Sequence, residues 1–305
     1  MKYFDEYRDA EIARKILANI RATSTRGPIR LMEVCGTHTV AIFRSGIKAL
    51  LPKNISLLSG PGCPVCVTPN EDIDKTIAIA KQKDVILTTF GDMIKVPGSN
   101  SNLEKERAQG ADIRVVYSAL DALDIARRNP KKKVVLLGIG FETTSPTIAS
   151  VILSADKEGI DNFFVLVTHK LIPPAMKALL DAEEVRIDGF LCPGHVSTII
   201  GSSPYEFIPK DYGIPCVIAG FEPLDILQSI LMAAQQIEQK EPKVEIEYRR
   251  AVRPQGNTTA LKVLYEVFEV CNVRWRGLDM IQKSGLRFRR KYRQFDAESA
   301  FGRLL

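Results

Sequence analysis

The chain has 305 residues, of which 45% are hydrophobic and 26% are charged, an ordinary composition for a globular protein. Its longest apolar runs are strand-sized, well below the ~20 residues of a membrane helix, and its charged N-terminus lacks the apolar core of a secretory signal. Composition therefore excludes the membrane, fibrous and disordered classes and predicts a soluble, cytoplasmic protein.

The net charge of +6 is concentrated in one segment. Residues 273–305 carry nine Lys/Arg and three Asp/Glu, whereas the rest of the chain is balanced. The stripe at residues 287–293 combines basic and aromatic side chains, a pattern that can bind phosphate backbones. Such a stripe is more often a solvated face or a docking surface for an acidic partner. We therefore expect no nucleic-acid partner and no membrane partner.

Apolar runs rich in β-forming residues alternate with segments of helical period along the first 220 residues. Segments 71–82 and 120–128 are typical of the helices. This alternation predicts an α/β fold with parallel sheets covered on both faces. The expected strands are 29–34, 55–59, 85–89, 113–117, 134–139, 163–167, 187–191 and 215–219.

The eight expected strands fit two sheets of about four. A break at Asn129-Pro130, followed by three lysines, indicates a boundary near residue 130. We therefore expect two similar parallel-sheet α/β domains around a central cleft, with a smaller helical or mixed region at the C-terminus. The expected bounds are 1–130, 131–222 and 223–305.

Residues that carry chemistry follow the expected strands with some regularity. All three histidines and four of the six cysteines lie on such loops, whereas Cys216 and Cys271 are expected in the core. Because ligands of parallel α/β sheets bind beyond the carboxyl ends of the strands, this coincidence predicts a functional site there. The loop residues are Cys35, His38, Cys63, Cys66, Glu142, His169, Cys192 and His195.

Cys63 and Cys66 are spaced to close a small disulfide or to chelate a soft metal. Together with Cys35 and His38 they offer three sulfurs and one imidazole, the ligand set of a structural zinc site. Each half lies on a separate strand-end loop of a large core, where folding needs no metal. Thiolates also suit iron, and a dithiol supplies two electrons, so redox or iron chemistry is the favoured alternative.

Other loop residues carry weaker signals. Glu142 is either a site base or a helix cap, and Thr143 and Thr144 are candidates to orient a ligand or cofactor. His195 is either a proton donor, a metal ligand or a structural hydrogen bonder. Gly220-Phe-Glu222 repeats Gly140-Phe-Glu142, which makes Glu222 a second carboxylate candidate.

Five motifs, taken together and in order, resemble the HypD family of hydrogenase maturation proteins. They are Met32-Glu-Val-Cys-Gly-Thr-His-Thr39, Gly60-Pro-Gly-Cys-Pro-Val-Cys-Val-Thr-Pro69, Gly140-Phe-Glu-Thr-Thr144, Cys192-Pro-Gly-His-Val-Ser197 and Gly220-Phe-Glu-Pro223. The resemblance implies a scaffold, more than a conventional enzyme, on which iron bearing cyanide and carbon monoxide is assembled for [NiFe]-hydrogenases and passed on.

The same resemblance implies roles for particular residues. Cys35 would hold the iron together with a HypC-type chaperone, and Cys63 and Cys66 would form the redox-active pair beside it. A HypE-type protein would donate the cyanide. His38, Glu142 and His195 would handle protons or orient ligands.

One family feature is missing from the sequence. Family members carry a C-terminal cysteine-rich segment that binds a [4Fe–4S] cluster through four thiolates. Beyond Cys216 this chain offers only Cys271, so the ligands of the expected cluster are not in it, through truncation or natural absence. Two rival hypotheses stay open: a thiol–disulfide oxidoreductase using Cys63 and Cys66, and a structural Cys3His zinc module.

Overall fold

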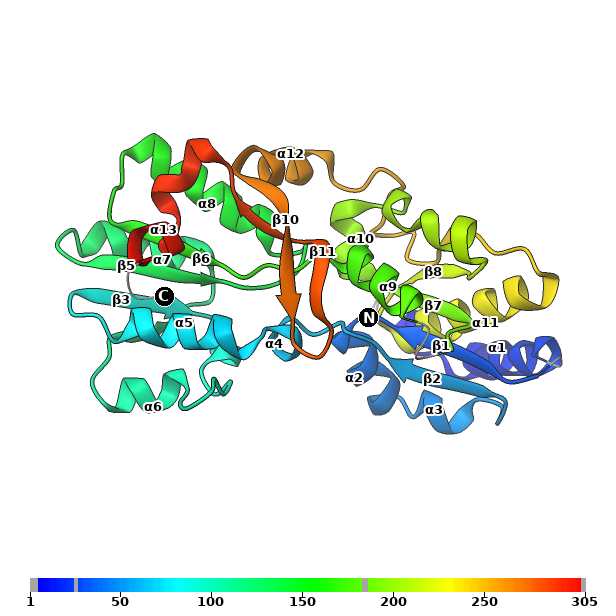
Figure 1. The fold of residues 1–305 in the computed structure, drawn as a ribbon. Coiled ribbons are helices and arrows are strands. Elements are labelled where there is room, and N and C mark those ends of the chain that lie inside the picture. Colours follow the sequence, from blue (N-terminus) through cyan, green and yellow to red (C-terminus); the bar gives the residue numbers. More distant parts are fainter. Residues whose placement is uncertain (1–4, 25–26, 183–185, 303–305) are drawn as a thin grey trace. The chain divides into compact units, whose positions relative to one another are not determined.

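The computed structural model describes residues 5–24, 27–182 and 186–302. The chain divides into two compact units, and each is built from two separate segments (Figure 1). Unit 1 comprises residues 1–63 and 175–258, and unit 2 comprises residues 64–174 and 259–305. Each unit holds one parallel sheet, so the predicted α/β class with two parallel-sheet domains is confirmed.

Unit 1 contains a five-stranded, fully parallel sheet of order β2-β1-β7-β8-β9. Its strands are β1 (Ile29–Glu33), β2 (Ile55–Ser59), β7 (Gly189–Pro193), β8 (Cys216–Ala219) and β9 (Val244–Ile246). Its helices are α1 (Ala10–Thr23), α2 (Gly36–Arg44), α3 (Ile47–Leu50), α10 (Gly194–Ile200), α11 (Pro223–Gln239) and most of α9 (Ile172–Asp181).

Helices α1 and α11 pack side by side in unit 1 (Figure 1). Ile20 of α1 and Ile230 of α11 are fully buried in one cluster with Leu31 of β1 and Val217 of β8. The apolar stripe of each helix is thereby removed from water against the sheet, which stabilises the unit by about 25 cal/mol per Å² of apolar surface.

Unit 2 contains a four-stranded parallel sheet of order β4-β3-β5-β6 and a separate antiparallel hairpin. The strands are β3 (Val85–Thr89), β4 (Ile113–Val115), β5 (Lys133–Gly138) and β6 (Phe163–Val167), and the hairpin pairs β10 (Phe268–Trp275) with β11 (Asp279–Phe288). The helices are α4 (Pro64–Val67), α5 (Asn70–Ala80), α6 (Leu103–Ala108), α7 (Ala119–Arg128), α8 (Ser145–Glu158), α12 (Thr258–Val267) and α13 (Ala297–Phe301).

The central strand β5 shows why its sequence reads as a continuous apolar run. Val134 and Leu136 point into one core cluster, and Val135 and Leu137 point into the cluster on the other face of the sheet. Because successive side chains of a strand alternate between faces, a strand covered on both faces must be apolar throughout.

The C-terminal residues do not form a region of their own. Helix α11 and β9 complete unit 1, and residues 259–302 pack within unit 2. The tail aromatics Phe288, Tyr292 and Phe295 are buried, so the basic stripe does not present interleaved rings to solvent. Cys271, which was expected in the core, lies half-buried in the hairpin strand β10.

The two sheets share one topology. In unit 1, β2 is added on one side of β1, and β7, β8 and β9 are added in turn on the other side. In unit 2, β4 is added on one side of β3, and β5 and β6 are added on the other. In open α/β sheets such a reversal of strand order leaves a crevice at the carboxyl ends of the two central strands, where ligands bind. The switch point of unit 1 therefore lies between β1 and β7.

Candidate functional site

Two predicted site residues lie at the switch point of unit 1. Cys35 follows the end of β1, and His195 follows the end of β7 in the first turn of α10. Cys63 closes the loop after the neighbouring strand β2. Parallel strands bring their carboxyl ends to one edge, so the fold gathers residues that are up to 160 positions apart in the sequence.

Cys35 is the residue that precedes helix α2 and has extended backbone geometry. It is half-buried, and burial raises the pKa of its thiol, although the backbone N–H groups of Thr37 and His38 lower it in part. The thiol is thus protonated at neutral pH in the isolated chain. A metal ion that binds the sulfur must displace this proton.

The Gly60-Pro-Gly62 turn packs directly against the backbone around Cys35. Gly60 N–H donates to Glu33 O at 2.8 Å, and Gly36 N–H donates to Gly62 O at 3.1 Å. These two bonds couple the β2 loop, which leads to Cys63, to the β1 loop, which carries Cys35.

Glu33, the last residue of β1, supports the same turn and was not singled out from the sequence. Its side chain is buried, and its carboxylate accepts hydrogen bonds from the hydroxyls of Thr39 and Ser59 and from Cys35 N–H at 3.2 Å. Burial raises the pKa of Glu33, and the three donors offset that rise in part.

His38 is fully buried in α2, and its role in the fold is well defined. Nε2 lies 2.9 Å from Gly220 O and 3.2 Å from Ala219 O; since carbonyls only accept, Nε2 carries the proton. Burial lowers the pKa of His38 to about 4, so the ring is neutral at pH 7. Nδ1 keeps a buried lone pair with no partner among the described residues.

Phe221 lies between two of the three histidines. Its ring stacks on His195 with centroids 3.8 Å apart and on His38 with centroids 4.6 Å apart. From the sequence motif Gly220-Phe-Glu222 we predicted a role for Glu222 and not for Phe221. His195 itself is exposed, and partial burial lowers its pKa.

Charged side chains from α11 and from the segment after β9 fix the loop that carries Phe221. Gly220 N–H donates to Glu247, whose pKa burial raises to about 7, and Asp225 forms a bidentate ion pair with Arg250. Glu222 accepts from Arg8 Nε at 2.7 Å and caps α11. Its carboxylate thus has two structural partners.

The chain passes from unit 1 to unit 2 between Cys63 and Cys66, the two cysteines of the predicted redox pair. Cys63 is half-buried and ends the first segment of unit 1, whereas Cys66 is exposed in the short helix α4 of unit 2. Cys192 and Cys216, by contrast, are fully buried in β7 and β8. The predicted core location of Cys216 is confirmed.

Glu142, Thr143 and Thr144 lie in unit 2, at the carboxyl end of β5. Glu142 is buried, its Oε1 accepts from Ile172 N–H at 3.0 Å, and burial raises its pKa to about 7. The hydroxyl of Thr144 donates to Ile139 O at 3.2 Å. Glu142 therefore caps α9, and its Oε2 has no partner among the described residues.

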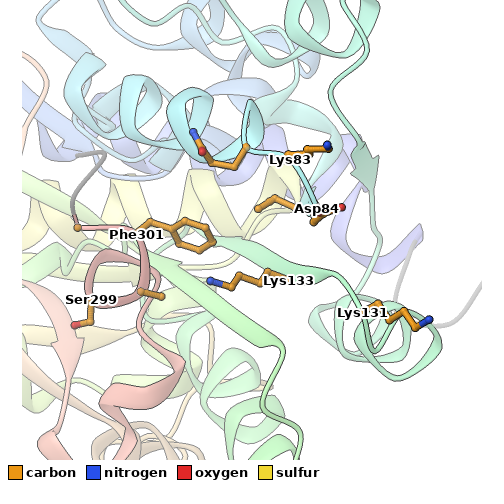
Figure 2. Close-up of a pocket in the computed structure, with 10 residues that line it drawn as sticks. Lys83, Asp84, Lys131, Lys133, Ser299 and Phe301 are labelled. Atoms are coloured by element: carbon orange, nitrogen blue, oxygen red, sulfur yellow. The ribbon is translucent and has the colours of Figure 1, made fainter.

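A pocket of about 760 Å³ lies at the opposite edge of the unit 2 sheet, at the amino ends of β3 and β5 (Figure 2). Lys83, Lys131 and Lys133 line it, and the Lys133 ammonium lies 5.2 Å from the centroid of Phe301. The three lysines at 131–133, which we expected at a domain boundary, lie within unit 2 instead, and Lys133 is the first residue of β5.

The described ranges, 5–24, 27–182 and 186–302, contain neither a ready-made metal site nor a membrane-spanning helix. No three His, Cys, Asp or Glu side chains there form a ready-made metal cage, and no helix there is both long and apolar enough to cross a membrane.

Comparison with known proteins settles the family. Residues 11–304 match the profile of HypD, described as "Hydrogenase formation hypA family". The chain belongs to the HypD family. It is 48% identical to hydrogenase maturation factor HypD of Rhodobacter capsulatus, across 99% of this chain and 82% of that protein.

More distant HypD-family relatives align over similar lengths. Hydrogenase maturation factor HypD of Escherichia coli K12 is 44% identical across 99% of this chain and 83% of its own. A putative hydrogenase expression/formation protein of Methanocaldococcus jannaschii is 43% identical across 94% of this chain and 80% of its own. The family resemblance drawn from the five sequence motifs is confirmed.

Proposed function

We propose that this chain acts in hydrogenase maturation as the scaffold on which an iron ion receives two cyanide ligands and one carbon monoxide, and from which the completed group is passed on. Cys35 is the proposed protein ligand, shared with a HypC-type chaperone. The observation that carries the proposal is the position of Cys35 at the switch point of unit 1, where the fold places a thiol at the start of a helix.

Cys63 and Cys66 are the proposed redox pair. Cyanide carried by a HypE-type partner as a thiocyanate needs two electrons for release, which yield a thiolate and cyanide. Oxidation of the Cys63–Cys66 dithiol to a disulfide supplies two electrons and releases two protons. Low-spin iron(II) with strong-field ligands tolerates the thiolate donor at Cys35.

The neighbours of Cys35 suit this proposal. His38 is neutral and holds the start of α2 against the end of β8, while His195 is exposed at the same edge. An exposed neutral imidazole is a group that takes up or delivers protons near pH 7. His195 is therefore the proposed proton carrier, and His38 the proposed structural support.

The test is anaerobic co-purification with a HypC-type partner, followed by metal analysis and infrared spectroscopy of the cyanide and carbonyl stretches. We expect iron and these bands in the wild type and their loss in Cys35→Ala. Cys271→Ala, which removes a half-buried thiol of unit 2, is the matched control and keeps the bands. Stoichiometric zinc without bands would favour the zinc module, and dithiol turnover that survives Cys35→Ala would favour a thiol oxidoreductase.

A further inference from the structure

A second cavity of unit 2, of about 470 Å³, lies between the first turn of α5, the residues after β6 and the β10–β11 hairpin. Part of its wall is apolar and includes Val167, Leu286 and Phe288, and its volume suits a small organic ligand. The lining also carries four Lys/Arg and four Asp/Glu side chains, so its net charge is zero. The charge of the cavity therefore favours neither a simple anion nor a simple cation.

Lys170 and Asp72 form the longest ion pair of this cavity. Lys170 is 2% exposed, yet its Nζ lies 3.4 Å from Asp72 Oδ2, beyond the ~2.7–2.9 Å of a strong charge-assisted hydrogen bond. Neither side chain has another hydrogen-bond partner among the residues that the structure describes. The other cations of the lining, Lys75, Arg274 and Arg287, contact carboxylates at 2.5 to 2.7 Å.

This loose pair leaves hydrogen-bonding capacity unused. An ammonium has three donors and a carboxylate has two acceptor oxygens, but Lys170 and Asp72 make one long bond between them. Buried charges normally have close partners, because an ion that leaves water loses its hydration free energy. A ligand that contacts both groups would supply the missing partners.

We propose that this cavity binds a free α-amino acid with an apolar side chain: its carboxylate accepts from Lys170, its ammonium donates to Asp72, and its side chain contacts the apolar wall. Such a zwitterion replaces one long ion pair with two and leaves the net charge of the cavity at zero. A simple acid would face the Asp72 carboxylate, and a simple amine would face the Lys170 ammonium. This site is separate from the proposed iron scaffold and does not depend on it.

Cys271 reports on the same cavity. It pairs with Gly285 across the hairpin, and Lys170 pairs with Gly285 on the other side. Residues directly opposite in an antiparallel ladder point their side chains to one face, so Cys271 and Lys170 share a face, and both line the cavity. The Cys271 thiol is free and half-buried. An amino acid bound at Lys170 therefore shields this thiol from alkylation.

The test is equilibrium dialysis of the reduced chain against labelled leucine, methionine and phenylalanine in turn, with iodoacetamide labelling of Cys271 read by peptide mass spectrometry. We expect saturable binding that suppresses the labelling of Cys271. The N-acetyl derivative, which lacks the ammonium, and the amide, which lacks the carboxylate, should do neither. Asp72→Asn keeps the shape of the side chain and should weaken binding at least about tenfold. Glu71→Gln, which removes the neighbouring exposed charge, is the matched control and keeps wild-type binding.

Several results would overturn the inference. They are no binding of any of the three amino acids, binding that leaves the labelling of Cys271 unchanged, and equal binding of the N-acetyl or amide derivative. Wild-type binding in Asp72→Asn would overturn it as well. If Asp72→Asn does not fold, the comparison of the amino acid with its two derivatives on the wild-type chain decides alone.

Discussion

A Cβ atom on Gly62 would lie 2.3 Å from the backbone nitrogen of Cys35. Real side chains do not approach a backbone atom so closely, so the loop after β2 can touch the Cys35 backbone only through glycine. Gly36, on the other side of Cys35, is different. A Cβ there would lie 3.8 Å from Cys63 Cβ, an ordinary contact.

The first prediction follows from this contrast. Gly62→Ala should force the loop away from Cys35, destabilise unit 1 by about 1–3 kcal/mol, and reduce iron bound with the HypC-type partner. Gly36→Ala should be neutral or stabilise α2 by up to about 1 kcal/mol. Urea unfolding followed by circular dichroism, with iron analysis, measures both. Equal behaviour of the two variants would contradict the packing argument.

The second prediction concerns Phe221. Phe221→Leu should lose both ring stacks and cost about 1–3 kcal/mol of unfolding free energy. It should also uncover the His195 ring, whose pKa burial now lowers, and let that pKa rise toward the usual value near ~6.5.

The measurement is an NMR titration of the His195 ring protons in wild type and variant. Phe207→Leu, which removes another half-buried ring of unit 1, serves as control and should leave the His195 pKa where it is. An unchanged His195 pKa in Phe221→Leu would show that the stack does not shield the imidazole.

The third prediction is a pH dependence in unit 2. Burial raises the pKa of Glu142 to about 7 in the folded state, whereas the unfolded chain ionises near 4.5. Glu142 therefore does not lower the free energy of unfolding below about pH 4.5, and it lowers that free energy increasingly as the pH rises toward 7. Glu142→Gln should match the wild type at pH 4.5 and be more stable by roughly 3 kcal/mol at pH 8.

Trp275 provides the readout for this comparison. It is the sole tryptophan of the chain, it is buried, and it stacks on Phe141 beside Glu142. Urea unfolding followed by its fluorescence at pH 4.5, 6 and 8 gives the difference between Gln and Glu. A difference that stays constant across these pH values would mean that Glu142 does not titrate with the raised pKa.

The fourth prediction is an order of thiol reactivity in the reduced protein. Cys66 is exposed and should be alkylated first, while burial slows Cys35 both sterically and by raising its pKa. Cys192 and Cys216 are fully buried and should react only when the unit 1 sheet opens. A time course of iodoacetamide labelling at pH 8, read by peptide mass spectrometry, checks the order. Early labelling of Cys192 would contradict the buried position of β7.

Strand positions could be predicted well from the sequence because the signals were local. The run at 163–167 and the strand β6 coincide, since a strand buried on both faces must be apolar and Gly159 and Asn162 mark the turn before it. The hairpin strand β10 was missed. Between its buried end residues, Phe268 and Trp275, it alternates between half-buried and exposed side chains, but the apolar helical pattern of α12 runs directly into it.

Contacts between distant segments could not be predicted from the sequence. The division into units depends on β1 pairing with β7, for which no local pattern exists. Cys35 and His195 were identified because their residue types are rare and follow strands. Glu33 and Phe221 were not, because a glutamate at the end of an apolar run and a phenylalanine in a loop gain meaning only from what they touch.

The strand order of unit 1 also governs how the protein is made. β1 emerges early from the ribosome, but its neighbour β7 begins only at residue 189, after most of unit 2 has been synthesised. Contacts of such high sequence separation form late. The thiols at positions 35 and 63 are consequently unprotected through more than 100 residues of synthesis. A nascent chain in this state is more open to oxidation and to premature metal capture than the finished fold, in which both thiols are half-buried.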